Sequence, residues 1–307
     1  MNKRLRTVWL CLMCLQPARI SSSSLLASVG TECVDTFKAG LPGAVISALL
    51  WCIAYDVPHA WPDVTGETEQ FIRKTWKEQG FLGADTVILK QIPADSFMAK
   101  VVVYTQEFPG ALAIGLPFIR RVEKLLAQQG QIKKELLRID DATRHKLLEQ
   151  ELALIETELD ECRFVCGHER VHQEQGHAYK ILVTQCVAPF AVYIVAQQSA
   201  RILRKYERLA WMAPCLEWKA TRSAAEIGIF WLKAHLYERE ADLHASTDPK
   251  VIEAGISLFK KAQNQKVPEM GPVGYRTKLM SWLLKYTHPV LSERIWYLTT
   301  ALKKLRS

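Results

Sequence analysis

The pattern of apolar residues between positions 141 and 172 predicts one long amphipathic helix. Apolar side chains recur there at spacings of four and three residues, which places them on one face of an α-helix. These side chains are Leu148, Leu152, Ile155, Leu159, Cys162 and Cys166. Asp141 precedes the stripe and is a suitable N-cap, because its carboxylate can accept hydrogen bonds from the first backbone amides.

The preceding segment predicts a short helix followed by a small sheet. Residues 67–78 have a helical amphipathic pattern, and residues 86–92 and 97–104 are rich in the β-branched side chains typical of strands. Residues 111–114 predict a strand at the edge of the sheet. An edge strand can hold a peptide backbone through strand addition, and an ordinary hairpin is the alternative interpretation.

Further helices are expected on both sides of this region. Residues 119–139 predict a charged amphipathic helix, broken near Gly130, that forms a helical hairpin with the helix after Asp141. Asp248-Pro249 is a suitable helix start, and residues 292–305 predict the last helix. The fold class expected is therefore α+β, mainly helical. We expect a signal- or anchor-like segment at 1–60 and one domain at 61–307, with a helical insertion at 119–160.

Composition is ordinary for a globular chain, and the charge pattern argues against nucleic acid as a partner. Hydrophobic residues make up 49% of the chain and charged residues 23%, and the net charge is +8. Basic residues are scattered among acidic ones, without a basic stripe interleaved with aromatic side chains. The eight cysteines form no spaced framework. Cys162 and Cys166 lie in the apolar stripe, which favours buried thiols over metal ligands.

Two segments bear on localisation. The first residues are cationic and precede a short apolar run, a pattern similar to a signal peptide. Residues 181–196 form an apolar run that is marginal for a bilayer span, so a buried or interfacial helix is favoured over a true span. Together these features favour a membrane-associated or exported protein over a cytoplasmic one.

The predicted long helix ends in a motif that can bind a metal. His168, Glu169 and His172 spell H-E-x-x-H, so the two imidazoles lie one helical turn apart on the same face. That spacing lets both bind one zinc ion, and Glu169 is placed to take a proton from a metal-activated water. A catalytic zinc ion usually has three protein ligands, so a third ligand is expected elsewhere.

Two candidates exist for the third ligand. His177 follows closely, but on a continuous helix it would point away from the face of His168 and His172, which favours a surface or supporting role. Glu238 and Asp242 share one helical face farther along the chain. Glu238 could complete the site, and Asp242 could orient a ligating histidine through its free ring nitrogen. An exposed acidic helix is the alternative reading of this segment.

Three motifs in this order resemble those of the HtpX-type zinc metallopeptidases, gluzincins that include the CAAX prenyl endopeptidases and the mitochondrial Oma-type proteases. They are His168-Glu-Arg-Val-His172, Glu238-Arg-Glu-Ala-Asp242 and Thr287-His-Pro-Val-Leu-Ser-Glu-Arg-Ile295. The resemblance covers roughly residues 86–302. Members of this family often have membrane helices between the second and third ligands. Inside H-E-x-x-H the family prefers apolar and small residues, whereas Arg170 places a charge there.

The resemblance implies a zincin-like fold with a small sheet beside the H-E-x-x-H helix. It also implies Zn²⁺ ligands His168, His172 and Glu238, with Glu169 as general base. His288 and Arg294 are expected near the active site as further catalytic groups.

We therefore expect a zinc-dependent metalloendopeptidase that acts on a protein or peptide substrate, possible membrane association and no nucleic-acid partner. The alternative is a membrane-associated interaction protein with a degenerate or structural zinc site.

Overall fold

The computed structural model describes residues 61–93, 105–108, 111–264 and 289–307. The chain divides into two compact units. Gln185–Ile227 belongs to one unit, and the other contains the described residues before Gln185 together with those of Gly228–Ser307. The predicted signal-like segment, the strand expected at 97–104 and His288 all lie outside the described residues.

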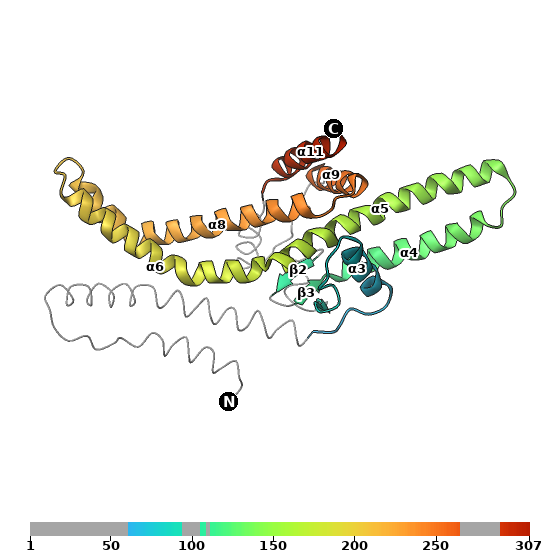
Figure 1. Ribbon diagram of the computed structural model, residues 1–307, viewed down its shortest axis with the longest axis horizontal. Coiled ribbons are helices and arrows are strands. Elements are labelled where there is room, and N and C mark those ends of the chain that lie inside the picture. Colours follow the sequence, from blue (N-terminus) through green and yellow to red (C-terminus); the bar gives the residue numbers. More distant parts are fainter. Residues whose placement is uncertain (1–60, 94–104, 109–110, 265–288) are drawn as a thin grey trace, which may run out of the picture. The chain divides into compact units, whose positions relative to one another are not determined.

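Helix α5, Ala142–Gln175, is the long helix that the apolar stripe predicted (Figure 1). The Asp141 carboxylate caps it by accepting hydrogen bonds from the backbone amides of Thr143 at 2.8 Å and Arg144 at 3.3 Å. The stripe is buried, with Leu152 partly so. Helix α5 ends at Gly176, whose φ of 61° is a left-handed conformation that favours glycine.

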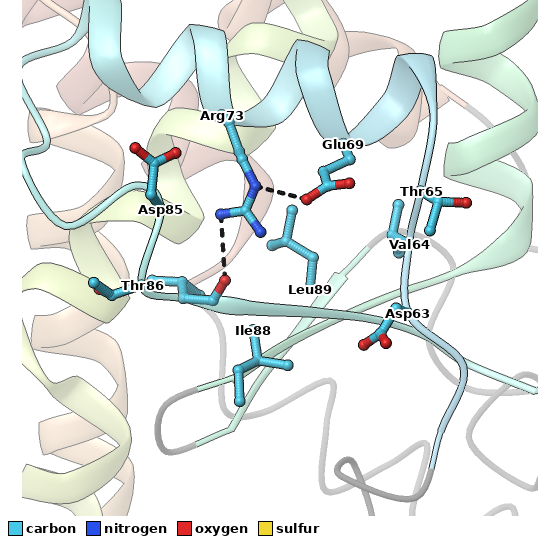
Figure 2. Close-up of a pocket in the computed structure, with 10 residues that line it drawn as sticks. Asp63, Val64, Thr65, Glu69, Arg73, Asp85, Thr86, Ile88 and Leu89 are labelled. Carbon is cyan, nitrogen blue, oxygen red and sulfur yellow. Dashed lines mark hydrogen bonds and ion pairs between the residues drawn. The ribbon is translucent and has the colours of Figure 1, made fainter.

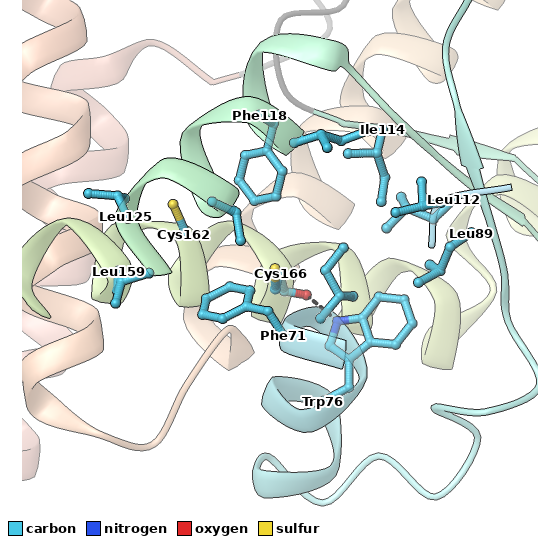
Figure 3. Packing of buried hydrophobic residues seen from close by; sticks show 14 of the residues in the cluster. Phe71, Trp76, Leu89, Leu112, Ile114, Phe118, Leu125, Leu159, Cys162 and Cys166 are labelled. Atoms are coloured by element: carbon cyan, nitrogen blue, oxygen red, sulfur yellow. Dashed lines mark hydrogen bonds between the residues drawn. The ribbon is translucent and has the colours of Figure 1, made fainter. Parts of the chain in front are cut away.

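Helix α3, Glu67–Glu78, confirms the predicted amphipathic helix and packs against α5. Figure 3 shows its Phe71 and Trp76 within the main hydrophobic core, beside Cys162 and Cys166 of α5. The Trp76 indole Nε1–H donates a hydrogen bond of 2.6 Å to the backbone carbonyl of Cys166. A buried indole needs such a partner, and this bond fixes α3 on the part of α5 that precedes the motif.

Helix α4, Leu116–Leu136, runs without interruption through Gly130, so the predicted break is wrong. Glycine within a helix costs only about 1 kcal/mol relative to alanine, which the packing of neighbouring turns offsets. Leu125 and Ile132, on either side of Gly130, are buried in the main core. Helix α4 packs along α5, which gives the expected helical hairpin (Figure 1).

The sheet has three described strands in the order β1-β3-β2. Strand β1, Ile88–Gln91, pairs in parallel with β3, Ala111–Ile114, and β2, Thr105–Phe108, pairs with β3 in antiparallel orientation. The strand predicted at 111–114 exists, but it lies in the centre of the described sheet, so its prediction as an edge strand is wrong. Its four residues are all buried, and β2 and β3 form the hairpin that was the alternative interpretation.

The C-terminal helices form a second hydrophobic core. Helix α9, Pro249–Asn264, begins at the predicted Asp248-Pro249 start, and the Asp248 carboxylate accepts a hydrogen bond of 2.9 Å from the Lys250 amide. Helix α11, Leu291–Arg306, confirms the predicted last helix and packs against α9 (Figure 1). Phe164 of α5 reaches this core and meets Phe259 edge to face at 5.7 Å.

The remaining helices connect the first motif segment, which ends at His172, to the second, which begins at Glu238. They are α6, His177–Arg204, the short helices η2, Ala210–Met212, and α7, Ala213–Glu217, and then α8, Lys219–His244. Helix α6 is long and apolar enough to cross a membrane, with a mean hydropathy of 1.6 over its most apolar window. Only 18% of that window is buried, so the structure does not show α6 as a buried helix, which was one of the two favoured alternatives for residues 181–196.

Candidate metal centre

Three side chains from two helices converge at one point. His168 and His172 project from α5, and Glu238 projects from α8. The Nε2 atoms of the two histidines are 3.0 Å apart. The Glu238 carboxylate lies 3.5 Å from His168 Nε2 through Oε2 and 3.4 Å from His172 Nε2 through Oε1. The two histidines are buried and Glu238 is 9% exposed, so the exposed acidic helix is the wrong reading of this segment.

These separations fit a tetrahedral metal site. Ligand bonds of about 2.0–2.1 Å at tetrahedral angles place two ligand atoms about 3.3 Å apart. The observed distances of 3.0, 3.4 and 3.5 Å bracket that value. Two imidazole nitrogens and a carboxylate oxygen are also a donor set that divalent transition metals accept. The residues present therefore fit a metal ion.

His168 is oriented through its second ring nitrogen by Asp242, which is the role that the sequence predicted for this carboxylate. His168 Nδ1 lies 2.9 Å from Asp242 Oδ1, so its Nε2 faces the cluster. Asp242 also accepts hydrogen bonds from the Arg294 guanidinium at 2.7 and 2.5 Å and from the Tyr297 hydroxyl. The carboxylate is fully buried, and α11 supplies these two donors.

Arg294 lies at the site, where its guanidinium contacts the carboxylates of Asp242 and Glu238. Its guanidinium stacks 4.1 Å from the centre of the Phe259 ring and lies 3.8 Å from Glu238 Oε2. Planar stacking combined with a two-point ion pair suits arginine and not lysine.

His172 is contacted on its far side by His177. His177 Nδ1 lies 2.9 Å from His172 Nδ1, because the chain turns at Gly176 and α6 begins at His177. The helix therefore does not continue in the way that would point His177 away, and its predicted surface alternative is wrong, since its side chain is fully buried. Its ring stacks on Tyr237 of α8, with centroids 4.4 Å apart.

The carboxylates of Glu238 and Asp242 favour positive charge at the cluster. Burial lowers the pKa of His168, but Glu238 and Asp242 outweigh burial and raise it to about 10. Burial raises the pKa of Asp242, but Arg294 and His168 outweigh burial and lower it. A field that favours positive charge on an imidazole also favours a divalent cation. Burial, with neighbouring His172 and Lys180, lowers the pKa of His177 to about 3, so His177 is neutral.

Glu169 lies on α5 directly after His168 and is 8% exposed. Its place in the chain is that of the expected general base, and its role stays a prediction. Cys162 and Cys166 are buried in the apolar core, and burial raises the pKa of Cys162 to about 11. The buried-thiol interpretation of these two residues is therefore confirmed, and the metal cluster does not include them.

Sequence reasoning missed the contacts that hold α8 against the motif. Gly167 precedes His168, and a Cβ atom there would lie 1.9 Å from the carbonyl oxygen of Ala245, just beyond the end of α8. The Arg170 guanidinium donates hydrogen bonds to the carbonyls of His244 at 2.7 Å and Gln79 at 3.1 Å. Arg170 thus joins the ends of α3 and α8 to α5, which explains a charge at this position. An isolated glycine within a helical pattern was the available signal for the close approach.

A separate pocket lies at α3 and β1 (Figure 2). It has a volume of about 330 Å³, and its lining includes Glu69, Arg73 and Thr86. Arg73 is held by Glu69 and by the carbonyl of Ala84. None of the residues of the metal cluster lines this pocket.

Comparison with known proteins identifies the family. The sequence profile of peptidase family M48 matches residues 145–302, which is just over half of the chain. Searches of the curated proteins and of the solved structures gave no match. The matched region contains His168, His172 and Glu238, which the structure brings together. The chain therefore belongs to peptidase family M48, whose members are metal-dependent peptidases and include the HtpX, Oma and CAAX protease types.

Proposed function

We propose that this protein is a zinc-dependent metalloendopeptidase that cuts protein or peptide substrates. The single observation that carries the proposal is the buried convergence of His168 and His172 with Glu238, at separations suited to a tetrahedral ion. Two imidazoles and one carboxylate leave a fourth position open, as a catalytic zinc site requires.

Each residue of the candidate site has a distinct role in the proposed reaction. His168, His172 and Glu238 would hold the ion. Zn²⁺ supplies Lewis-acid chemistry, because it lowers the pKa of a water molecule and polarises the scissile carbonyl. Glu169 would act as general base, accepting a proton from the attacking water and passing it to the leaving amine. His288 is a further candidate for stabilising negative charge in the transition state. The contacts of Arg294 with Asp242 and Glu238 favour a positioning role for it.

The test uses the full chain purified with its metal. We expect about one zinc ion per chain, and internal cleavage of casein that a chelator abolishes. Glu169→Gln should keep the zinc and lose hydrolysis by at least about 10²-fold, because an amide cannot accept the proton. Glu238→Ala should lose most of the zinc. Glu151→Gln, at an exposed position on the same helix, is the matched control and should behave like the parent.

Two outcomes would overturn the proposal. Hydrolysis at the parent rate in Glu169→Gln would remove Glu169 from its role. Full zinc content without hydrolysis of any protein by the parent would instead favour the interaction protein with a structural zinc site.

We also propose that α6 is in contact with a lipid bilayer. It has 28 residues, and large apolar side chains are exposed along it. These include Val183, Val187, Ile194, Val195 and Ile202. Basic Arg201 and Arg204 stand near its end, as expected where a helix meets lipid headgroups.

A pair of single-cysteine additions tests this location. Val195 of α6 and Leu154 of α5 are 64% and 68% exposed, so Val195→Cys and Leu154→Cys should react equally with a water-soluble maleimide if both lie in water. We label membrane fragments that contain the protein and are accessible to the reagent from both sides. We expect Val195→Cys to be protected from the maleimide by lipid and Leu154→Cys to react, as measured by mass spectrometry of the labelled peptides. Equal labelling would contradict membrane contact of α6.

A further inference from the structure

We propose that His177 is a positioning residue that fixes the tautomer and the ring orientation of His172. The inference rests on the proposed metal site, because it concerns how one ligand of that site is held. It adds to the site a residue, His177, that lies outside the H-E-x-x-H and E-x-x-A-D motifs.

The local backbone creates the contact. Gly176 adopts a left-handed φ of 61° and ends α5, and His177 is the first residue of α6. This turn brings the His177 ring beside the ring of His172, with centroids 4.9 Å apart and planes at 82°. His177 is fully buried, so water cannot replace it as the neighbour of His172.

The proton positions follow from the distances. The Nδ1 atoms of His172 and His177 are 2.9 Å apart, so only one of them can carry the proton between them. His172 must keep its Nε2 lone pair towards the cluster, so its proton is on Nδ1 and is donated to His177 Nδ1. His177 then carries its own proton on Nε2, whose contact of 3.3 Å with Glu240 Oε2 does not have the geometry of a hydrogen bond. The contact between the Nδ1 atoms of His172 and His177 therefore permits one arrangement of protons once His172 Nε2 faces the cluster.

The orientation of the His177 ring is set by α8. Tyr237 stacks on it nearly parallel, at 13° between the planes, and Glu240 lies on the same helix. Helix α8 also supplies Glu238 and Asp242. Each ligating histidine is thus fixed through its Nδ1 by residues connected to α8: His168 directly by Asp242, and His172 through His177.

The experiment measures the dissociation constant for Zn²⁺ in the full chain by competition with a chelator of known affinity. His177→Phe keeps a ring on Tyr237 but removes the acceptor, and we expect about 10–100-fold weaker zinc binding. His177→Asn keeps an acceptor near the Nδ1 position and should restore an affinity close to the parent's. His145→Phe removes a partly exposed α5 histidine that also lies beside a glutamate, Glu149, and should leave the affinity unchanged. Co²⁺-loaded His177→Phe should keep the visible bands of a protein-bound ion but at shifted wavelengths, whereas an unfolded chain would lose these bands.

A second measurement on the unaltered protein covers the case in which His177→Phe does not fold. In the zinc-loaded protein labelled with ¹⁵N-histidine, NMR should show His172 protonated on Nδ1 and neutral His177 protonated on Nε2. The inference would be overturned if His177→Phe bound zinc as tightly as the parent, or if His177→Asn bound it as weakly as His177→Phe. It would also be overturned if NMR found His177 protonated on Nδ1. A parent chain that binds no zinc would instead refute the proposed function itself.

Discussion

Asp242 accepts hydrogen bonds from Arg294 and Tyr297 on one fully buried carboxylate while it contacts the ring of His168. A buried carboxylate with a single partner would be costly, because its remaining lone pairs would lose water without replacement. In Asp242 both carboxylate oxygens accept hydrogen bonds. Asp242 can therefore remain ionised and hold His168 in the tautomer that points Nε2 at the cluster.

This geometry predicts the effect of Arg294→Gln. Breaking one partner of a buried ion pair leaves the other charge uncompensated, so we expect a loss of about 3–5 kcal/mol in the free energy of unfolding. Denaturant unfolding of the metal-free protein measures it. Arg306→Gln on the same helix breaks the exposed pair with Glu253 and should cost at most about 1 kcal/mol. Equal losses in the two variants would show that Arg294 does not support the buried carboxylate.

At the scale of elements, the metal centre depends on how closely α8 approaches α5. Gly167 has no side chain where the Ala245 carbonyl passes, and a Cβ atom there would meet backbone rather than a flexible side chain. Gly167→Ala should therefore separate the helices. We expect a loss of about 1–3 kcal/mol in unfolding free energy. Zinc affinity should fall as well, because Glu238 and Asp242 move with α8.

Gly130→Ala is the matched control for this change. Gly130 also lies within a helix, α4, but a Cβ atom there meets nothing within 4 Å. Alanine should raise the free energy of unfolding by about 0.4–1 kcal/mol and leave zinc binding unchanged, since it restricts the unfolded chain. Both variants are compared by denaturant unfolding and by zinc titration. Parent-like zinc affinity and stability in Gly167→Ala would refute the close approach as a determinant of the site.

Elements with local signals were predictable from the sequence. The stripe from Leu148 to Cys166 and the cap at Asp141 predict the course of α5, because both signals depend on residues only two to four positions apart. The central position of β3 was not predictable in the same way. Burial of all four of its residues depends on pairing with β1 and β2, and period-two alternation carries no information about which strands lie at an edge.

The candidate site was predictable in its ligands and in the contact of Asp242 with a ligating histidine, but not in its other supports. Spacing placed His168 and His172 on one face, and the motif order brought in Glu238. The contact of His177 with His172 depends on the left-handed turn at Gly176, for which a glycine beyond a helix end was the only signal. The hydrogen bond from Tyr297 to Asp242 joins residues 55 positions apart, and no local pattern indicates it.

At the scale of the molecule, the metal centre lies within one of the two compact units, although its ligands come from two separate stretches of that unit. His168 and His172 precede Thr184, where the chain leaves the unit, and Glu238 follows Gly228, where it returns. A metal ion held by all three closes a loop of more than sixty residues. Such a cross-link stabilises the folded unit, because the unfolded chain does not hold the ligands together.

Metal removal should therefore lower the melting temperature of the unit that contains the site. Zinc at about a thousandfold excess over its dissociation constant contributes about 4 kcal/mol to the free energy of unfolding. For a unit of this size that corresponds to roughly 10 °C, which calorimetry of the full chain with and without chelator would detect. Glu238→Ala should melt at the same temperature in both conditions, because it lacks one of the ligands. If the zinc-loaded parent also melts at an unchanged temperature after chelation, the ion does not join the two stretches of this unit.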